Sequence, residues 1–135
     1  VKIIRPWPAE PTLSAEQWVE IREIWERSPR KLIVAGQSVF DAALTETLRL
    51  VQQELQVPVV GDVLSNLHEI PETVRLADTI LMQPDEDLRR ELRPDLLITF
   101  GNSLISKNLK LFLRRHRPAA HWHLQPAGRV ADPFQ

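Results

Sequence analysis

The sequence contains no cysteine, few glycines and no long hydrophobic run. Without cysteine the chain has no disulfide, no thiolate zinc site and no cysteine nucleophile. No apolar run reaches the roughly 18 residues that a membrane-spanning helix needs. Residues 1–12 include three prolines and lack the apolar segment of a signal peptide, so we expect neither a membrane span nor a signal peptide in this sequence.

The sequence also has almost no excess of charge of one sign. The 17 Lys and Arg residues nearly balance the 18 Asp and Glu residues, which leaves a formal net charge of -1. No strong electrostatic field is therefore available to attract nucleic acid or a membrane surface, and we expect neither as a partner. A length of 135 residues with 43% hydrophobic and 26% charged residues predicts one globular domain with one core.

The first residues have the composition of a linker. Pro6, Pro8 and Pro11 favour an extended arm of the polyproline type. We therefore divide the chain into a proline-rich interdomain arm at 1–13 and a domain at 14–135. The chain begins with Val rather than Met, so we expect a processed product or a piece of a longer protein. We expect Trp7 to anchor the arm against a neighbouring surface.

Hydrophobic periodicity predicts strands that alternate with helices. Short apolar runs predict four buried strands at 32–35, 57–60, 95–100 and 120–124. Helical spacing and capping residues predict five helices at 14–28, 41–56, 73–82, 85–92 and 106–117. This alternation implies βαβ units with right-handed crossovers. The predicted fold class is α/β, a Rossmann-like (NAD/FAD-binding-like) parallel sheet with helices on both faces.

Helical spacing also predicts which side chains face the core. Trp18 and Trp25 lie seven residues apart in the first predicted helix and share one face, so we expect both to pack in the core. In the helix at 41–56, the residues expected to point inward are Leu44, Leu48, Val51 and Leu55.

The best candidate for a binding site follows the third predicted strand. Ligands of open α/β sheets bind outside the carboxyl ends of the strands. There Gly101 permits a tight turn, Asn102 and Ser103 are small and polar, and a helix begins near Ser106. Lys107 lies in the first helical turn, where the helix dipole disfavours a cation. This placement is compatible either with anion binding or with an ordinary solvated lysine.

Other motifs indicate no chemistry of their own. The sequence has no G-x-G-x-x-G, no Walker A motif and no G-x-S-x-G elbow. His121 and His123 share one face of a strand, but no nearby acid completes a metal site, so we interpret them as structural or surface residues. The acidic run 85–87 suits a helix start and the basic run 114–117 a helix end. We predict no catalytic, cofactor-binding or metal-binding residue in this chain.

Four segments carry a resemblance to a known family. They are 32–36, 57–65 (VPVVGDVLS), 95–107 (DLLITFGNSLISK) and 128–133 (GRVADP). In order and spacing, across about residues 31–133, they resemble the central domain of SEPHCHC synthases. These are thiamine-diphosphate-dependent transferases of menaquinone and phylloquinone biosynthesis. The pair GDVLS and G-x-S-L-x-x-K is the most diagnostic part.

The resemblance implies a three-domain cytoplasmic enzyme that forms a homo-oligomer. Its first domain binds the pyrimidine of thiamine diphosphate and supplies the activating glutamate, and its last domain binds the diphosphate through Mg²⁺. The central domain has largely lost cofactor binding. The intact enzyme joins 2-oxoglutarate, after decarboxylation, to isochorismate. This chain lacks the Gly-Asp-Gly signature with a later Asn, so we expect no cofactor in it and no activity from it alone.

The resemblance also implies a substrate contact. In the family, a basic pair after the third strand binds a substrate carboxylate. Lys107 matches the first member of the pair, whereas Asn108 replaces an arginine. The substrate-binding candidates are therefore Lys107 and Asn108, with Asn102 and Ser103 before them. Two alternatives remain open, namely a stand-alone module that binds a small anion or nucleotide at 101–107, and the central domain of another thiamine-diphosphate enzyme.

Overall fold

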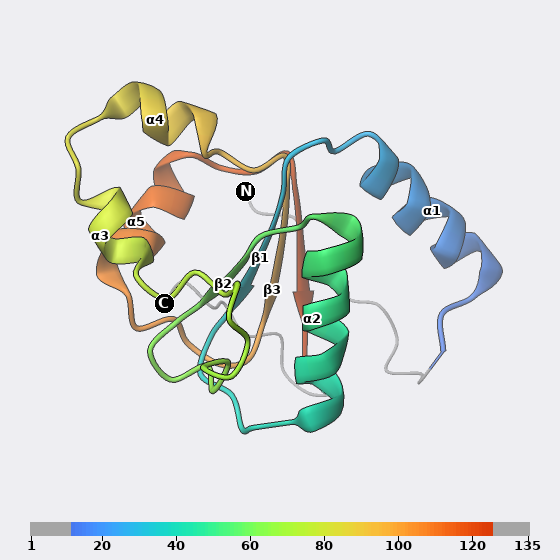
Figure 1. Ribbon diagram of the computed structural model, residues 1–135. Coiled ribbons are helices and arrows are strands. Elements are labelled where there is room, and N and C mark those ends of the chain that lie inside the picture. Colours follow the sequence, from blue (N-terminus) through green and yellow to red (C-terminus); the bar gives the residue numbers. More distant parts are fainter. Residues whose placement is uncertain (1–11, 126–135) are drawn as a thin grey trace.

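The computed structural model describes residues 12–125 (Figure 1). Four strands form one fully parallel sheet in the order β2-β1-β3-β4. The strands are β1 (Lys31–Ala35), β2 (Val59–Gly61), β3 (Leu96–Phe100) and β4 (Ala120–Leu124). The helices are α1 (Ala15–Glu26), α2 (Ala42–Leu55), α3 (Ala77–Leu81), α4 (Glu86–Glu91) and α5 (Lys107–Arg115). In the register of the sheet, Ile33 lies opposite both Val59 and Ile98.

Helices cover both faces of this sheet, as predicted. Figure 1 shows α2 on one side of the strands and α3 and α5 on the other. Alternate strand residues supply the two halves of the core, because successive side chains of a strand point to opposite faces. Ile33 and Ile98 pack with Leu48 of α2, while Val34 and Leu97 pack with Phe112 of α5. The predicted Rossmann-like α/β fold is therefore confirmed.

Side-chain caps fix where four of the helices begin. Ser14 and Gln17 form a capping box at α1. The carboxylate of Asp41 accepts the Leu44 N–H at 3.0 Å at α2, and Asp85 and Ser106 cap α4 and α5 in the same way. A cap needs only a short polar side chain beside the unsatisfied N–H groups of a helix. For that reason the predicted starts of these helices are confirmed.

The predicted start of the helix at 73–82 is wrong, because α3 begins at Ala77. Val74 instead pairs with the outer edge of β2. Its N–H donates to the Val59 carbonyl at 2.9 Å, and its carbonyl accepts the Gly61 N–H at 3.1 Å. These bonds need an extended backbone at Val74, so the helix can begin only after this residue. The second strand also starts later than predicted, at Val59 rather than residue 57.

Two predicted core positions are wrong. Trp18 is 56% exposed, whereas Trp25 packs against the core. Both lie on one face of α1, but the helix meets the sheet with its C-terminal part and its start extends away from the sheet (Figure 1). Leu55 is 54% exposed because it ends α2, where the chain turns at Gln56 with a φ of 53°. The other three inward leucine and valine positions of α2 do contact the core.

Several predictions fall outside the described residues. The arm at 1–13 is described only from Thr12, so the anchoring of Trp7 is untested, and so is the segment 128–133. Within residues 12–125, no helix has the length and apolar character that crossing a membrane requires.

Candidate functional site

The candidate site residues lie at the point where the strand order reverses. The chain passes from β1 to β2 on one side and then crosses to β3 on the other. The loops at 36–41 and 101–106 therefore leave the carboxyl ends of neighbouring strands that lead in opposite directions. In open α/β sheets, this switch point is where a crevice normally holds a ligand. Asn102 and Ser103 lie there, and Lys107 and Asn108 follow directly.

Backbone contacts close this crevice. The Asn102 N–H donates to the Gln37 carbonyl at 2.8 Å, and the Gln37 N–H donates to the Ser103 carbonyl at 3.3 Å. A Cβ atom on Gly36 would lie 2.4 Å from the Asn102 carbonyl oxygen. Gly101 has a φ of +80°, and a Cβ atom on it would lie 2.8 Å from the Gln37 carbonyl oxygen and 3.0 Å from that of Gly36. The two loops therefore touch through their backbones at this point.

A buried carboxylate ties a third loop to this pair. Asp62 follows β2 and is 4% exposed. Its Oδ2 accepts the N–H groups of Ile105 and of Ser106, the latter at 3.2 Å. Its Oδ1 accepts the Val63 N–H at 2.7 Å. Asp62 thus supplies the negative charge that the start of α5 attracts.

The hydroxyl of Ser106 completes this arrangement. It accepts the Leu109 N–H at 3.1 Å and lies 2.5 Å from the Asp78 carboxylate, to which it donates. The N–H groups of Ile105, Ser106 and Leu109 are therefore bonded to the protein's own side chains. The sequence left open whether an external anion binds here, and it did not predict the role of Asp62. The available signal was an acidic residue at the end of the second predicted strand.

The predicted substrate-binding residues lie at the surface of this region. Asn102, Ser103 and Lys107 are exposed, and Asn108 is half-buried. The side chains of Lys107 and Asn108 make no hydrogen bond or ion pair with other described residues. The Lys107 ammonium is therefore free to meet a group supplied from outside residues 12–125. Asn102 and Ser103 contribute their backbone groups to the closed loops described above.

The two strand histidines meet at a buried hydroxyl. The Oγ1 atom of Thr99 lies 2.8 Å from His121 Nε2 and 2.9 Å from His123 Nδ1. The prediction that both histidines share one face of the strand is confirmed by this shared contact. Among residues 12–125, no three or more His, Asp or Glu side chains are grouped so that they could hold a metal ion.

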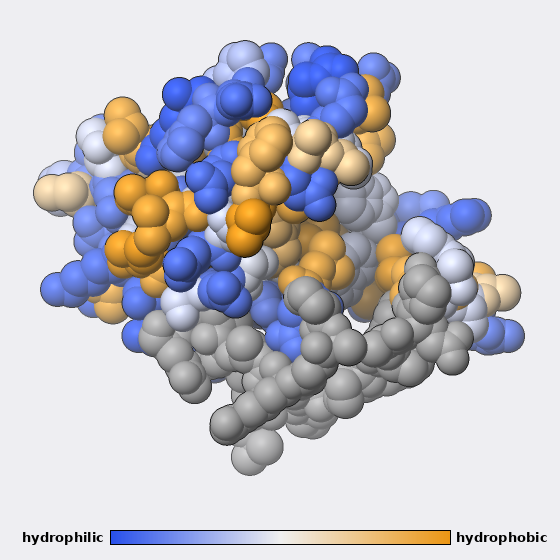
Figure 2. All heavy atoms as spheres, turned by 90° about the horizontal axis from the view of Figure 1, so that it is seen from below, coloured by the Kyte–Doolittle hydropathy of each residue, from blue (hydrophilic) through white to orange (hydrophobic). Residues whose placement is uncertain are grey.

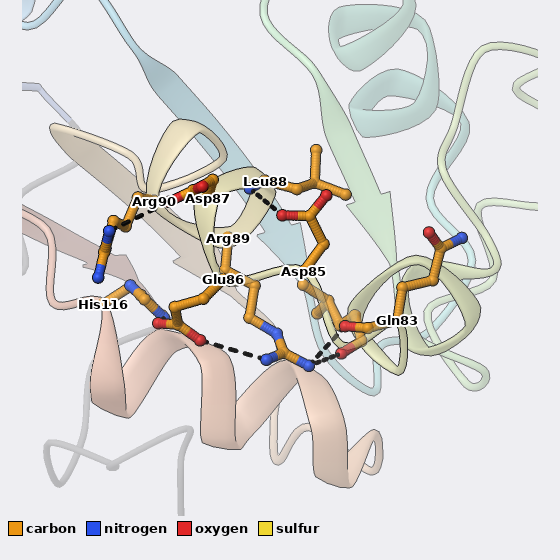
Figure 3. Close-up of polar contacts among 9 residues, drawn as sticks. Gln83, Asp85, Glu86, Asp87, Leu88, Arg89, Arg90 and His116 are labelled. Atoms are coloured by element: carbon orange, nitrogen blue, oxygen red, sulfur yellow. Dashed lines mark hydrogen bonds and ion pairs between the residues drawn. The ribbon is translucent and has the colours of Figure 1, made fainter.

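A second polar cluster fixes α4 in place (Figure 3). The guanidinium of Arg89 donates to the carbonyls of Leu81 at 2.9 Å and Gln83 at 2.7 Å, and to the Glu86 carboxylate at 3.3 Å. His116 approaches Glu86 from α5 at 3.4 Å. Asp85 caps the helix. The acidic run 85–87 therefore serves helix α4, as predicted, and forms no site.

An apolar cavity of about 380 Å³ lies at the opposite edge of the sheet. It is bounded by the amino ends of β1 and β2 and by α3 and α5, with Leu32, Val57, Leu81 and Phe112 among its walls. Sequence reasoning missed this cavity, because periodicity shows which side chains face inward and not how tightly they fill the space. Leu109 and Phe112 of α5 line the cavity, but none of the predicted substrate-binding residues does.

The sequence is similar to a defined family and to full-length enzymes. Residues 4–135 match a family model described as the middle domain of thiamine pyrophosphate. The chain is 40% identical over 125 residues to the 2-succinyl-5-enolpyruvyl-6-hydroxy-3-cyclohexene-1-carboxylate (SEPHCHC) synthase of Cytophaga hutchinsonii, covering 92% of this chain and 22% of that enzyme. The synthase of Desulfotalea psychrophila is 37% identical over 128 residues, covering 94% of this chain and 24% of that enzyme.

A third similar enzyme extends this pattern. The SEPHCHC synthase of Flavobacterium johnsoniae is 36% identical over 120 residues, which cover 85% of this chain and 21% of that enzyme. The chain thus spans less than a quarter of the length of these curated relatives. The resemblance that the four sequence segments predict is confirmed.

Proposed function

The chain belongs to the family of thiamine pyrophosphate middle domains, and from this premise we propose that it is the central domain of a SEPHCHC synthase. The intact enzyme would join decarboxylated 2-oxoglutarate to isochorismate in menaquinone or phylloquinone biosynthesis. The observation that carries the proposal is the 40% identity over 125 residues to a synthase of that name. The two alternatives have less support, because the three relatives described above share one name and the N–H groups of Ile105, Ser106 and Leu109 are already bonded.

In this proposal the chain alone is inactive, and thiamine diphosphate and Mg²⁺ bind to other domains of the intact enzyme. The sequence supports this division, since the chain lacks the Gly-Asp-Gly signature with a later Asn. Among residues 12–125, no three His, Asp or Glu side chains gather at one point, and we assign Mg²⁺ to no residue of this chain.

Lys107 is the residue that we assign to substrate. It is exposed at the start of α5, and its ammonium can pair with a substrate carboxylate as a single point charge. Asn108, beside it, can donate one neutral hydrogen bond, whereas an arginine would grip a carboxylate with two. We assign Asn102 and Ser103 to the same contact region, because their exposed side chains precede Lys107 on the loop that the closed switch point holds in place.

The partners of this domain would be the N-terminal and C-terminal thiamine-diphosphate-binding domains of the same polypeptide. The arm at 1–13 would connect it to the domain before it. We propose that the intact enzyme is a cytoplasmic homo-oligomer, as the family resemblance implies.

The proposal is tested on the intact polypeptide with the variant Lys107→Ala. A hydrogen bond to a charged group contributes about 1.5–3 kcal/mol, so KM for the carboxylate substrate should rise roughly ten- to a hundredfold. The control is Arg115→Ala, which removes an exposed cation at the other end of α5 and should leave KM unchanged. Equal KM values for Lys107→Ala and the unmodified enzyme would remove Lys107 from the substrate site.

A further inference from the structure

A second and smaller cavity, of about 160 Å³, lies beside the end of β2. Its walls include Gly61 and Asp62, at the end of the strand, and Ser65, Thr73 and Arg75 from the loop that leads to α3. Figure 2 looks onto this end of the molecule and shows hydrophilic residues at its surface among hydrophobic ones. None of the predicted substrate-binding residues lines this cavity, so it is distinct from the predicted substrate contact.

Two buried hydroxyls of this wall have no hydrogen-bond partner. Thr73 is 6% exposed, and its Oγ1 atom has no partner within residues 12–125. Ser65 is 2% exposed, and its hydroxyl likewise makes no hydrogen bond within these residues. A buried hydroxyl without a partner costs free energy, so native proteins rarely contain one. Two of them in one wall indicate that the cavity holds a group to which they bond.

The side chains of Ser65 and Thr73 meet at Gly61. A Cβ atom placed on Gly61 would lie 2.8 Å from Ser65 Oγ and 3.0 Å from Thr73 Cγ2. Any larger residue at this position would push the two side chains away, because both approach the same point. Glycine therefore keeps them close enough for one small ligand to contact both.

Arg75 adds a positive charge to the same wall. Its Nη2 atom donates to the carbonyl of His68 at 2.6 Å and to that of Ile70 at 3.4 Å. These two carbonyls hold the guanidinium in one orientation. Its Nε and Nη1 atoms have no acceptor within residues 12–125, so their N–H groups remain available to a ligand.

The Asp62 carboxylate also belongs to the wall, but its hydrogen-bonding capacity is already used. Its oxygens accept the N–H groups of Val63, Ile105 and Ser106, and these dipoles stabilise its negative charge. The unused groups of the cavity are therefore two hydroxyls and the N–H donors of Arg75. A ligand that satisfies them must offer hydrogen-bond acceptors and, beside a guanidinium, a negative charge.

We propose that this cavity binds a small oxyanion, a carboxylate or a phosphate, through the hydroxyls of Ser65 and Thr73 and the guanidinium of Arg75. An apolar cavity of about 150 Å³ accommodates benzene, so this one has room for roughly six non-hydrogen atoms. Acetate and inorganic phosphate meet this limit, whereas 2-oxoglutarate and isochorismate exceed it. The inference therefore goes beyond the proposed function and does not depend on it.

Calorimetric titration of the intact polypeptide with inorganic phosphate and, separately, with acetate tests this inference. Thiamine diphosphate and Mg²⁺ are present at saturation, so that the probes do not occupy a diphosphate site elsewhere in the polypeptide. At least one probe should bind, and Arg75→Gln should weaken its affinity roughly tenfold to a hundredfold. Binding of one probe without the other identifies the oxyanion as a phosphate or a carboxylate. The control Arg90→Gln removes a cation of α4 that is 69% exposed and does not line the cavity, so the affinity should stay unchanged.

The variant Thr73→Val separates a binding role from a structural one. Valine has nearly the shape of threonine but lacks the hydroxyl that has no partner. The urea midpoint should therefore stay equal or rise, since no hydrogen bond is lost within the protein. The affinity for the probe should nevertheless fall about twofold to tenfold, because one donor to the oxyanion is removed.

Three results would overturn the inference. The first is that neither probe binds at concentrations up to about 50 mM. The second is an equal affinity in the unmodified protein, Arg75→Gln and Thr73→Val, which would place the bound anion elsewhere. The third is a lower urea midpoint of Thr73→Val with unchanged affinity, which would assign the cavity to ordered water. None of these measurements uses synthase activity, so this inference and the proposed function can fail separately.

Discussion

Removing the Asp62 carboxylate should destabilise the protein more than removing any exposed helix cap. In the variant Asp62→Ala, the N–H groups of Ile105, Ser106 and Val63 lose their acceptor. A hydrogen bond to a charged group contributes about 1.5–3 kcal/mol, and the loss is partly offset because a buried charge disappears as well. We expect the free energy of unfolding to fall by about 3–4 kcal/mol, which corresponds to a Tm lowered by roughly 10 °C.

Urea unfolding followed by tryptophan fluorescence measures this loss, and thermal unfolding followed by circular dichroism checks it. The matched control is Asp41→Ala, which removes the exposed cap of α2 and one hydrogen bond of 3.0 Å to Leu44. That substitution should cost about 1 kcal/mol. If Asp62→Ala costs no more than Asp41→Ala, then Asp62 does not join the three loops, and our account of the closed switch point is refuted.

Three further predictions follow from the same geometry. Gly36→Ala should cost about 2–3 kcal/mol of unfolding free energy, because its Cβ would lie 2.4 Å from the Asn102 carbonyl oxygen; a urea midpoint equal to that of the unmodified chain would contradict this. The hydrogen bond from Arg30 lowers the pKa of Asp95 in the folded state, so the pair stabilises the fold above about pH 4 and this contribution is lost as the pH falls through the lowered pKa. The free energy of unfolding, measured between neutral pH and pH 2, should therefore decline less in Asp95→Asn than in the unmodified protein. An equal decline in the two proteins would contradict a stabilising ion pair between Arg30 and Asp95. In the intact enzyme Asn108→Arg should lower KM for the carboxylate substrate by about tenfold, since arginine can bind a carboxylate through two hydrogen bonds; an unchanged or raised KM would exclude position 108 from the contact.

The features of the fold that depend on residues close together in the chain were predictable from the sequence. Buried strands appear as apolar runs, and Ser14, Asp41 and Ser106 mark helix starts because a cap acts within one helical turn. The start of α3 was not predictable, since it depends on the pairing of Val74 with a strand that is distant in sequence. The exposure of Trp18 was not predictable either, because it depends on where α1 meets the sheet.

The candidate site was likewise predictable only where it depends on residues close together in the chain. The loop with Asn102 and Lys107 was located by the rule that ligands bind at the carboxyl ends of parallel strands. Its closure was not predicted, because it requires Gly36 to meet a backbone 66 positions away and Asp62 to reach the start of α5 across 43 positions. Sequence patterns describe one segment at a time and do not register such contacts.

An assay of the intact polypeptide tests whether this chain is the middle domain of a SEPHCHC synthase. The purified full-length protein is supplied with thiamine diphosphate, Mg²⁺, 2-oxoglutarate and isochorismate, and the product is identified by mass spectrometry. We expect SEPHCHC and carbon dioxide in equal amounts from the intact polypeptide and no product from residues 1–135 alone. Absence of product from the intact polypeptide, or turnover by the isolated chain, would contradict it.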